Sequence, residues 1–345
     1  MTQVSWKCPS NIALIKYWGK KGNQLPANAS LSFTLNECFT KTTVKLLPKT
    51  SNEKFEFSFF FDLKPNPAFE PKLNSFFKNI YEMFKFLNEY KLEIFSENSF
   101  PHSSGIASSA SAFGALALCL CSIEKQFGVN FDTNEFYKKA SKVARLGSGS
   151  ACRSVFAPIA LWGKNEIFEQ ANDEYAIPYN FAHKIFDNFC DTILIVDSGA
   201  KEVSSSIGHS LLNNNPFAIN RFNEANKNLN FLNIALQSGD FELFNSTAES
   251  EALMLHALMM TSKPYFILMK PNTLNIIETV WKYRKSSKLN LTITLDAGAN
   301  VHLLYPYSQK LQVRDFINDE LLKYCSNGKI INDFVGNGPE KVEIA

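Results

Sequence analysis

Apolar side chains recur at every second position, or in short unbroken runs, through most of the chain up to about Pro71. A repeat of two is that of a β-strand, because successive side chains point to opposite faces of a sheet. The pattern therefore predicts a strand-rich first part, with strands within 11–20, 27–36, 41–47 and 54–63. The first of these segments begins apolar at Asn11 and ends in a basic, aromatic turn at Lys20.

Helical spacing, with apolar residues three and four positions apart, follows in much of the remaining chain. The clearest ends belong to one segment, where Asp132 and Glu135 resemble a capping box and Gly147 is a typical stop. The pattern predicts helices at 73–90, 111–127, 132–146, 216–237, 240–260 and 272–285, and extended segments at 92–99, 192–197, 290–295 and 301–305. The polar segment 165–187 lies between the earlier and the later elements and predicts a connection between two domains.

Composition adds that the chain is long enough for one large or two medium domains. It has 345 residues, of which 45% are hydrophobic and 20% are charged. Lys and Arg number 35 against 33 Asp and Glu, so the net charge is only +2. Such a balance gives no overall field that would recruit nucleic acid or a membrane surface, and we expect neither as a partner. Any anion site must therefore gather its cations locally.

The sequence also indicates a cytoplasmic protein. The longest run of apolar residues and glycine, 112–121, is too short to span a bilayer, and 1–11 lacks the charged start and apolar centre of a signal peptide. The seven cysteines are scattered without a C-x-x-C pair. This usage predicts reduced and mostly buried thiols.

A candidate anion site lies at Pro101–Ala110, PHSSGIASSA, where small hydroxyl residues and glycine come directly before an apolar helix. Unpaired backbone N–H groups and the positive end of the helix dipole favour an anion at such a position. The segment is neither a Walker A loop nor a GxGxxG turn. The alternative interpretation is a serine-rich cap on an ordinary core helix.

Two further loops rich in small residues carry candidate chemistry. In Gly147–Ser154, GSGSACRS, flexible backbone and hydroxyls surround Arg153, whose planar guanidinium suits a carboxylate or a phosphate. A solvated glycine-serine hinge is the alternative there, although the apolar run that follows would hold the loop in place. Ser198–His209 is a third hydroxyl-rich loop, for which a simple turn is the slightly favoured interpretation when the segment is taken alone.

Single charged residues are more ambiguous. Lys16 lies between apolar and aromatic neighbours at a strand end, where an unpaired ammonium would be costly to bury, but it could equally lie on an exposed face. Asp296 opens the segment DAGAN, and an Asp in that position is also a common turn residue. Glu249, Glu251 and His256 share one predicted helix without a facing pair of metal ligands, so we interpret them as polar helix residues.

Taken together, four segments resemble the mevalonate diphosphate decarboxylase family of the GHMP kinase superfamily: NIALIKYWGK, PHSSGIASSA, GSGSACRS and DAGAN. They follow the family's order from residue 11 to residue 300, whereas GHMP kinases in general share only the phosphate loop. The resemblance implies an α+β fold in two parts. These are an N-terminal domain like ribosomal protein S5 domain 2 at 1–184 and a ferredoxin-like C-terminal domain at 185–345, with the site in the cleft between them.

The activity that the resemblance implies is ATP-dependent decarboxylation of mevalonate 5-diphosphate to isopentenyl diphosphate, ADP, phosphate and CO2. Asp296 would be the base or orienting group at the tertiary hydroxyl, and Lys16 would hold that aspartate and the reacting oxygens. Arg153 would bind the substrate carboxylate beside Ser150. The 5-diphosphate would lie against Tyr17, Lys20 and Ser148, with Ser205 or Ser204 matching the family's Val-Ser-Ser run.

The cofactors implied are ATP and Mg2+, and the partner implied is a second copy of the chain in a homodimer. The resemblance assigns the ATP phosphates to the loop residues Pro101, Ser104, Gly105, Ala107, Ser108 and Ser109, with Ser109 also toward the magnesium ion. A site that crowds a carboxylate, a diphosphate and a triphosphate against Asp296 would repel itself without compensation. Lys16, Lys20, Arg153 and magnesium would supply it.

The chain departs from the family's pattern at a few positions. Ile106 replaces the usual Leu, His102, Ser103 and Ser104 replace Thr-Ala-Ala, His209 stands where Met is common, and Ala299 replaces Pro. These changes bear on the shape of the diphosphate pocket and so on which phosphorylated mevalonate fits. The alternatives are a decarboxylase of mevalonate 5-phosphate, a small-molecule kinase without decarboxylation, and a catalytically silent ligand-binding relative. Retention of Lys16, Arg153 and Asp296 together argues against the last.

Overall fold

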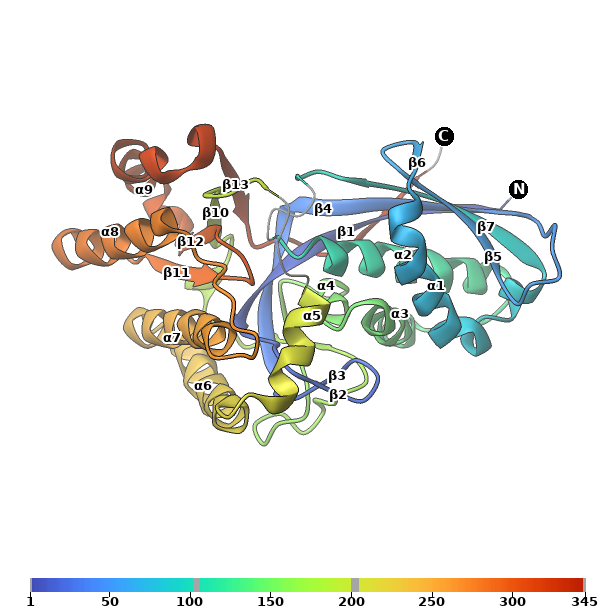
Figure 1. Ribbon diagram of the computed structural model, residues 1–345, viewed down its shortest axis with the longest axis horizontal. Coiled ribbons are helices and arrows are strands. Elements are labelled where there is room, and N and C mark those ends of the chain that lie inside the picture. The colour runs from blue at the N-terminus through green and yellow to red at the C-terminus, as the bar shows by residue number, and fades with distance from the viewer. Residues whose placement is uncertain (1, 102–105, 200–204, 344–345) are drawn as a thin grey trace.

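The computed structural model describes residues 2–101, 106–199 and 205–343. They form an α+β structure in two parts, each built on its own sheet (Figure 1). None of the helices in these ranges combines the length and the apolar character needed to cross a bilayer. The long strands β1 (Gln3–Ile15) and β4 (Ser30–Pro48) run from the middle of the molecule, beside the second part, into the first part (Figure 1).

The larger sheet belongs mainly to the first part of the chain. Its order is β14-β1-β4-β7-β5-β6, with β8 and β9 added beside β4, and the β5–β7 pairing is parallel while the others are antiparallel. The remaining strands are β5 (Glu56–Phe61), β6 (Lys64–Pro65), β7 (Tyr90–Asn98), β8 (Ile159–Trp162), β9 (Ile177–Pro178) and β14 (Glu340–Val342). Because β14 pairs with β1, the end of the chain lies on the first sheet.

Three helices cover one face of this sheet (Figure 1): α1 (Glu70–Ile80), α2 (Ser108–Gln126) and α3 (Thr133–Gly147). Nearly all of α2 is buried, as expected for a helix that is apolar on every side. At the start of α3, Asp132 and Glu135 form the predicted capping box. The helix predicted at 73–90 was wrong beyond Ile80, where the 3-10 turns Tyr81–Met83 and Lys85–Asn88 replace it around an extended Phe84.

The second part of the chain forms an antiparallel four-stranded sheet in the order β11-β12-β10-β13. Its strands are β10 (Cys190–Leu194), β11 (Thr292–Leu295), β12 (Val301–Tyr305) and β13 (Ile330–Phe334), and its helices are α6 (Ala218–Ser238), α7 (Phe241–Met260), α8 (Pro271–Ser287) and α9 (Lys310–Phe316). The three long helices were all predicted. Strand β10 begins and ends earlier than the predicted 192–197.

Short elements fill the loops that the sequence singled out. A hairpin of β2 (Lys20–Lys21) and β3 (Leu25–Pro26) follows β1, and α4 (Ala151–Ser154) lies within the GSGSACRS segment. The loop predicted at Ser198–His209 was wrong in its second half, where the short helix α5 (Ser205–Ser210) begins. The seven cysteines are unpaired and buried, as predicted. The strands predicted at 27–36 and 41–47 are one continuous β4.

The two parts pack against each other through β4. Phe33 of β4 contacts Phe189 and Phe244 of the second part, with ring centroids 5.6 Å and 6.2 Å apart. A buried carboxylate adds a polar connection, because Asp333 of β13 accepts hydrogen bonds from the backbone N–H groups of residues 36, 37 and 38, each at 2.8 Å. These three residues lie where the pairing of β4 with β1 is interrupted. Asp333 therefore supplies the acceptors that this irregular stretch lacks.

Replacement of Asp333 by Asn should lower the free energy of unfolding by about 3 kcal/mol, because at least one buried N–H loses its acceptor and the new amide N–H groups face other donors. Urea unfolding followed by circular dichroism measures this loss. Asp319→Asn, which changes an exposed carboxylate in the same way, is the control and should stay within about 0.5 kcal/mol of wild type. Equal stability of both variants would contradict the role given to Asp333.

Candidate active site

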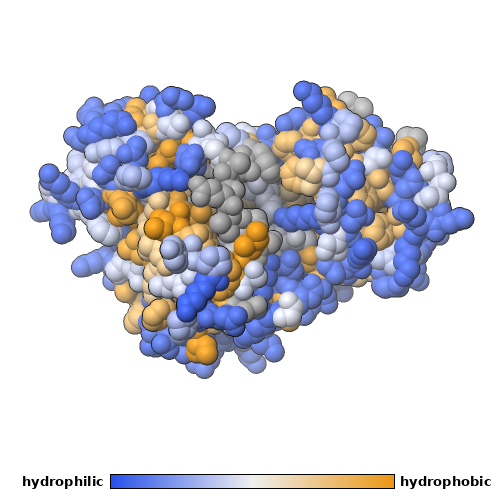
Figure 2. Space-filling model, in the orientation of Figure 1, coloured by the Kyte–Doolittle hydropathy of each residue, from blue (hydrophilic) through white to orange (hydrophobic). Residues whose placement is uncertain are grey.

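A cavity of about 560 Å³ lies where the end of β1, α1, the start of α2, the 147–153 segment, α5 and the turn after β11 converge. The space-filling view shows the two halves as separate lobes with a notch along the upper edge between them (Figure 2). Nine of the residues singled out from the sequence line this one cavity: Lys16, Tyr17, Lys20, Ala107, Ser109, Ser148, Ser150, Arg153 and Asp296. Segments far apart in the chain thus meet at a single site.

The other predicted residues lie differently. Pro101 is exposed, and neither it nor Ser108 lines the cavity. Ser205 is the first residue of α5. Ser104, Gly105 and Ser204 lie outside the described residues.

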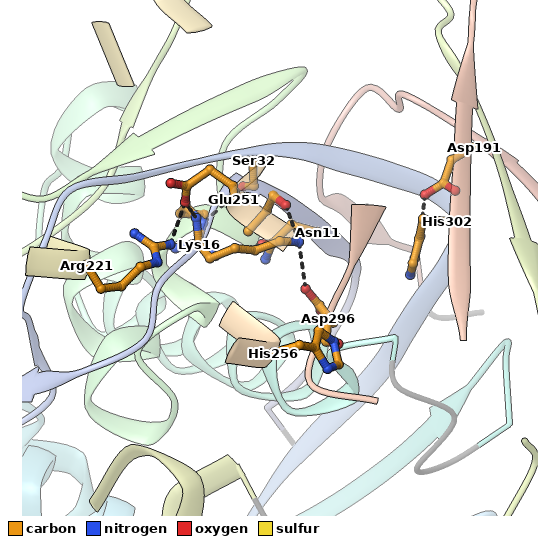
Figure 3. Close-up of polar contacts among 11 residues, drawn as sticks. Asn11, Lys16, Ser32, Asp191, Arg221, Glu251, His256, Asp296 and His302 are labelled. Atoms are coloured by element: carbon orange, nitrogen blue, oxygen red, sulfur yellow. Dashed lines mark hydrogen bonds and ion pairs between the residues drawn. The ribbon is translucent and has the colours of Figure 1, made fainter. Parts of the chain in front are cut away.

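The centre of the cavity is a lysine–aspartate pair (Figure 3). Lys16 is buried at the end of β1, and its Nζ lies 3.4 Å from Oδ1 of Asp296, while it donates a hydrogen bond of 2.5 Å to the carbonyl of Ala13. Burial lowers the pKa of Lys16 from its usual value, and the charge of Asp296 opposes that shift. Asp296 keeps 22% of its side chain accessible. Both side chains line the cavity, but the Asp296 carboxylate is the more accessible of the two and the Lys16 ammonium is buried.

Side chains of α6 and α7 bind the backbone of this pair. This role was not predicted from the sequence. Glu251 accepts hydrogen bonds from the backbone N–H of Lys16 at 2.9 Å and from Nη2 of Arg221 at 2.6 Å (Figure 3). His256 lies 3.1 Å from the backbone carbonyl of Asp296 through Nε2. Both residues are buried, so their polarity serves internal hydrogen bonds and not a solvated helix face. No group of metal-ligating side chains occurs in the described part of the chain.

Arg153 is a buried cation with neutral partners. Its guanidinium donates to Ser32 Oγ at 3.0 Å, to Ser30 Oγ at 2.6 Å and to Asn11 Oδ1 at 3.2 Å, and the residue is only 2% exposed. Within the described ranges no carboxylate lies within ion-pair distance of it, and burial lowers its pKa. Each terminal nitrogen retains a second N–H. A buried charge with unused donors is suited to an anionic ligand in the cavity.

Tyr17 provides another unused donor. Its hydroxyl is buried without a hydrogen-bond partner, and burial raises the pKa of Tyr17 well above its usual value, so it remains a phenol. Gly149 makes room for it, because a Cβ at that position would lie 2.4 Å from the hydroxyl oxygen. A buried O–H without an acceptor is costly, and because this hydroxyl is fully enclosed, a phosphate oxygen in the cavity would reach it after a shift of the surrounding wall.

The start of α2 is suited to a phosphate and its metal ion. Ala107, in a left-handed conformation with φ of 41°, precedes the helix, and no side chain of the described residues caps the first turn. Ser109 Oγ lies 3.1 Å from Ser148 Oγ, which brings hydroxyls from two of the loops together at the cavity wall. Open N–H groups, a helix dipole and hydroxyl oxygens are the donors and ligands that a magnesium-bound polyphosphate requires. These residues therefore fit such a group.

The charge around the cavity is strongly positive although the chain as a whole is nearly neutral. Among the described residues, four basic side chains and one carboxylate line it: Lys16, Lys20, Lys72, Arg153 and Asp296. Lys72, on α1, was not predicted, because its own segment shows only the pattern of an amphipathic helix. Its ammonium lies 5.1 Å from the centre of the Phe113 ring. The local concentration of cations required by the low net charge is thus present.

Comparison with known proteins decides the family. Residues 8–175 match the model of the diphosphomevalonate decarboxylase-like N-terminal domain, and residues 192–341 match that of the mevalonate 5-diphosphate decarboxylase C-terminal domain. The chain belongs to the diphosphomevalonate decarboxylase family. Family membership agrees with the resemblance found in the four sequence segments.

Relatives with this family's name cover almost the whole chain. The diphosphomevalonate decarboxylase of Ganoderma lucidum is 26% identical over 97% of this chain and 85% of its own length, and that of Saccharomyces cerevisiae is 28% identical over 91% and 80%. Among solved structures, mevalonate diphosphate decarboxylase from Staphylococcus aureus is 29% identical with a TM-score of 0.84, covering 99% of this chain and 98% of that one. A structure described as MDDEF in complex with MVAPP, AMPPCP and magnesium is 27% identical with a TM-score of 0.84, covering 99% of both chains.

In this member of the decarboxylase family, Lys72 should make anion binding depend on pH. The residue is exposed as a whole, but it lines the cavity, and loss of hydration there, with a smaller contribution from the charge of Lys20, lowers the pKa of Lys72 to about 8. Lys72 is therefore cationic below pH 8 and loses its charge above it. We expect Lys72→Gln to weaken binding of inorganic pyrophosphate about tenfold at pH 7 and much less at pH 9.5.

Titration calorimetry at each pH gives the dissociation constants of Lys72→Gln and of wild type for pyrophosphate. The ratio of these two constants cancels the ionisation of pyrophosphate itself. Lys78→Gln is the matched control, because Lys78 lies on the same helix but does not line the cavity. It should bind like wild type at both pH values. If the ratio of the Lys72→Gln and wild-type dissociation constants were the same at pH 7 and pH 9.5, titration of Lys72 could not be the cause of a pH-dependent affinity.

Proposed function

We propose that the protein catalyses the ATP-dependent decarboxylation of mevalonate 5-diphosphate to isopentenyl diphosphate, ADP, phosphate and CO2. The observation that carries this proposal is the Lys16–Asp296 pair beside the unpaired Arg153 in a cavity lined by cations. A carboxylate facing the cavity suits a proton acceptor, while the surrounding cations suit a substrate that carries both a carboxylate and a diphosphate. The family's named relatives support the same reaction.

Asp296 accepts or orients the proton of the tertiary hydroxyl in this proposal. Lys16 stabilises negative charge on the Asp296 carboxylate and on the reacting oxygen, because its ammonium lies 3.4 Å from Oδ1 of Asp296. His256 holds the backbone carbonyl of Asp296, and Glu251 holds the backbone N–H of Lys16. The geometry of the pair is therefore set by groups that need not contact the substrate.

Arg153 binds the substrate carboxylate through its two remaining N–H groups, with Ser150 beside it. Tyr17, Lys20, Ser148 and Ser205 are assigned to the 5-diphosphate, and the unpartnered hydroxyl of Tyr17 supports this assignment. Holding the carboxylate at one end and the diphosphate at the other places the tertiary hydroxyl beside Asp296. Such positioning removes much of the entropic cost of the reaction.

MgATP, when bound, supplies the phosphoryl group that turns the tertiary hydroxyl into a leaving group. We assign its phosphates to the loop before α2, with Pro101, Ser104, Gly105, Ala107, Ser108 and Ser109, and its metal ion to Ser109. The uncapped start of α2 supports this assignment, although Pro101 and Ser108 lie outside the cavity wall. Burial lowers the pKa of Lys20, and a nearby phosphate would favour the charged form of this side chain.

Three further properties are part of the proposal. We place the division between the domains at residues 184 and 185, in the connection between β9 and β10. We place the protein in the cytoplasm, which its seven unpaired cysteines support because oxidising compartments favour disulfides. The homodimer implied by the resemblance stays a prediction, and analytical ultracentrifugation tests it.

The decisive experiment supplies MgATP with mevalonate, its 5-phosphate or its 5-diphosphate and follows ADP and CO2 in parallel. Equal amounts of ADP and CO2 from the diphosphate alone are the expected result. ADP without CO2 would make the protein a kinase, and CO2 from the monophosphate alone would make it a decarboxylase of mevalonate 5-phosphate. Neither product from any substrate would indicate a catalytically silent relative.

A further inference from the structure

His209, on α5, lies in the wall of the cavity. Its ring lies between two aromatic residues of the turn after β1, with centroids 4.7 Å from Tyr17 and 4.5 Å from Trp18. The preceding residue, Gly208, allows α5 to approach closely, because a Cβ there would lie 2.5 Å from the Trp18 ring. The imidazole is therefore held in one place by packing.

A backbone hydrogen bond determines which ring nitrogen carries the proton. The N–H of Gly19 lies 3.0 Å from Nδ1 of His209, and because a backbone N–H can only donate, Nδ1 must be the acceptor. Burial, with a further contribution from the charge of Lys20, lowers the pKa of His209 to about 3. The ring is therefore neutral at physiological pH, and its one proton is on Nε2.

Nε2 lies on the opposite side of the ring from the contact with Gly19. It has no hydrogen-bond partner among the described residues, yet it is not one of the fully enclosed polar atoms that lack a partner. The residue is largely buried, and the cavity is the open volume that it lines, together with Lys20 and Tyr17. An N–H donor is thus fixed in direction and available to a ligand.

We propose that His209 is a specificity-determining residue of this protein, which donates a hydrogen bond from Nε2 to the 5-diphosphate of the substrate. The inference rests on the proposed function and deepens it. The diphosphate is the favoured acceptor because the His209 ring lies 4.7 Å from the ring of Tyr17, and Tyr17 and Lys20, which line the same cavity, are the residues assigned to that group. A neutral donor adds a hydrogen bond without adding another cation to repel Lys20.

Two substitutions distinguish the role of Nδ1 from that of Nε2. Asn can place an acceptor near Nδ1 but no donor near Nε2, whereas Gln can place a donor near Nε2. His209→Asn should raise KM for mevalonate 5-diphosphate about tenfold and leave kcat and KM for ATP within about twofold of wild type. His209→Gln should stay within about threefold of wild type in all three constants. Because both variants lose the same ring contacts, a packing defect would affect them equally.

Steady-state kinetics of the three proteins therefore tests the proposal. An unchanged KM in His209→Asn would overturn it, and so would an equal increase in both variants. Calorimetry with inorganic pyrophosphate in the absence of ATP tests the donor role of His209 independently of the proposed decarboxylase activity. If wild type releases no CO2 while His209→Asn alone binds pyrophosphate about tenfold more weakly, the donor role stands and the decarboxylase assignment falls.

Discussion

Asp296→Asn is expected to reduce the release of both ADP and CO2 by about 10²–10⁴-fold, the range that a positioned acid–base group contributes. The substitution preserves the shape of the side chain and the backbone carbonyl that His256 contacts at 3.1 Å. It removes the proton acceptor and the counter-charge of Lys16. The pKa of Lys16, already lowered by burial, should then fall further because its principal opposing charge is gone.

Binding measurements distinguish a loss of chemistry from a loss of structure. Titration of Asp296→Asn with MgATP should give a dissociation constant within about threefold of wild type, because the start of α2 is untouched by the substitution. Rapid-quench measurement of a single turnover shows whether phosphoryl transfer or a later step is slowed. Full activity in this variant would remove Asp296 from the mechanism.

Local patterns in the sequence predicted most helices and strands, and the errors occurred where distant residues decide the backbone. The strands predicted at 27–36 and 41–47 were separated because 37–40 breaks the pattern. In the structure that stretch continues β4, since Asp333 of a remote strand satisfies three of its N–H groups. The predicted helix beyond Ile80 failed because apolar residues in 3-10 turns have nearly the same spacing as in an α-helix.

The candidate site was predictable to the extent that its residues fall in segments with an unusual composition. Lys16, Arg153 and Asp296 each lie in such a segment, and the structure brings them to one cavity. Lys72 and Glu251 lie on helices of ordinary composition, so only the packing of α1 and α7 against the site gives them a role. Residues that reach the site from a helix of ordinary composition leave little signal in a single sequence.

Arg153→Gln is the second substitution with a large expected effect, a fall in kcat/KM for mevalonate 5-diphosphate of about 10²–10³-fold. Among the described residues no carboxylate forms an ion pair with this buried guanidinium, so an anion that enters the cavity would gain a direct contact with its charge. Glutamine retains a donor but has neither the charge nor the planar fork. Arg153→Lys should also be strongly impaired, because an ammonium is a point charge that cannot replace two parallel N–H groups.

Arg145→Gln is the matched control for this prediction. Arg145 is equally buried, but it is paired with Glu174 and does not line the cavity, so its loss should affect stability while kcat/KM changes less than about threefold. Thermal unfolding with and without mevalonate 5-diphosphate provides an independent measurement, since bound substrate should raise the Tm of wild type and Arg145→Gln but not of Arg153→Gln. If substrate stabilised Arg153→Gln as much as wild type, the carboxylate would have to bind elsewhere, and the buried charge of Arg153 would need a purely structural explanation.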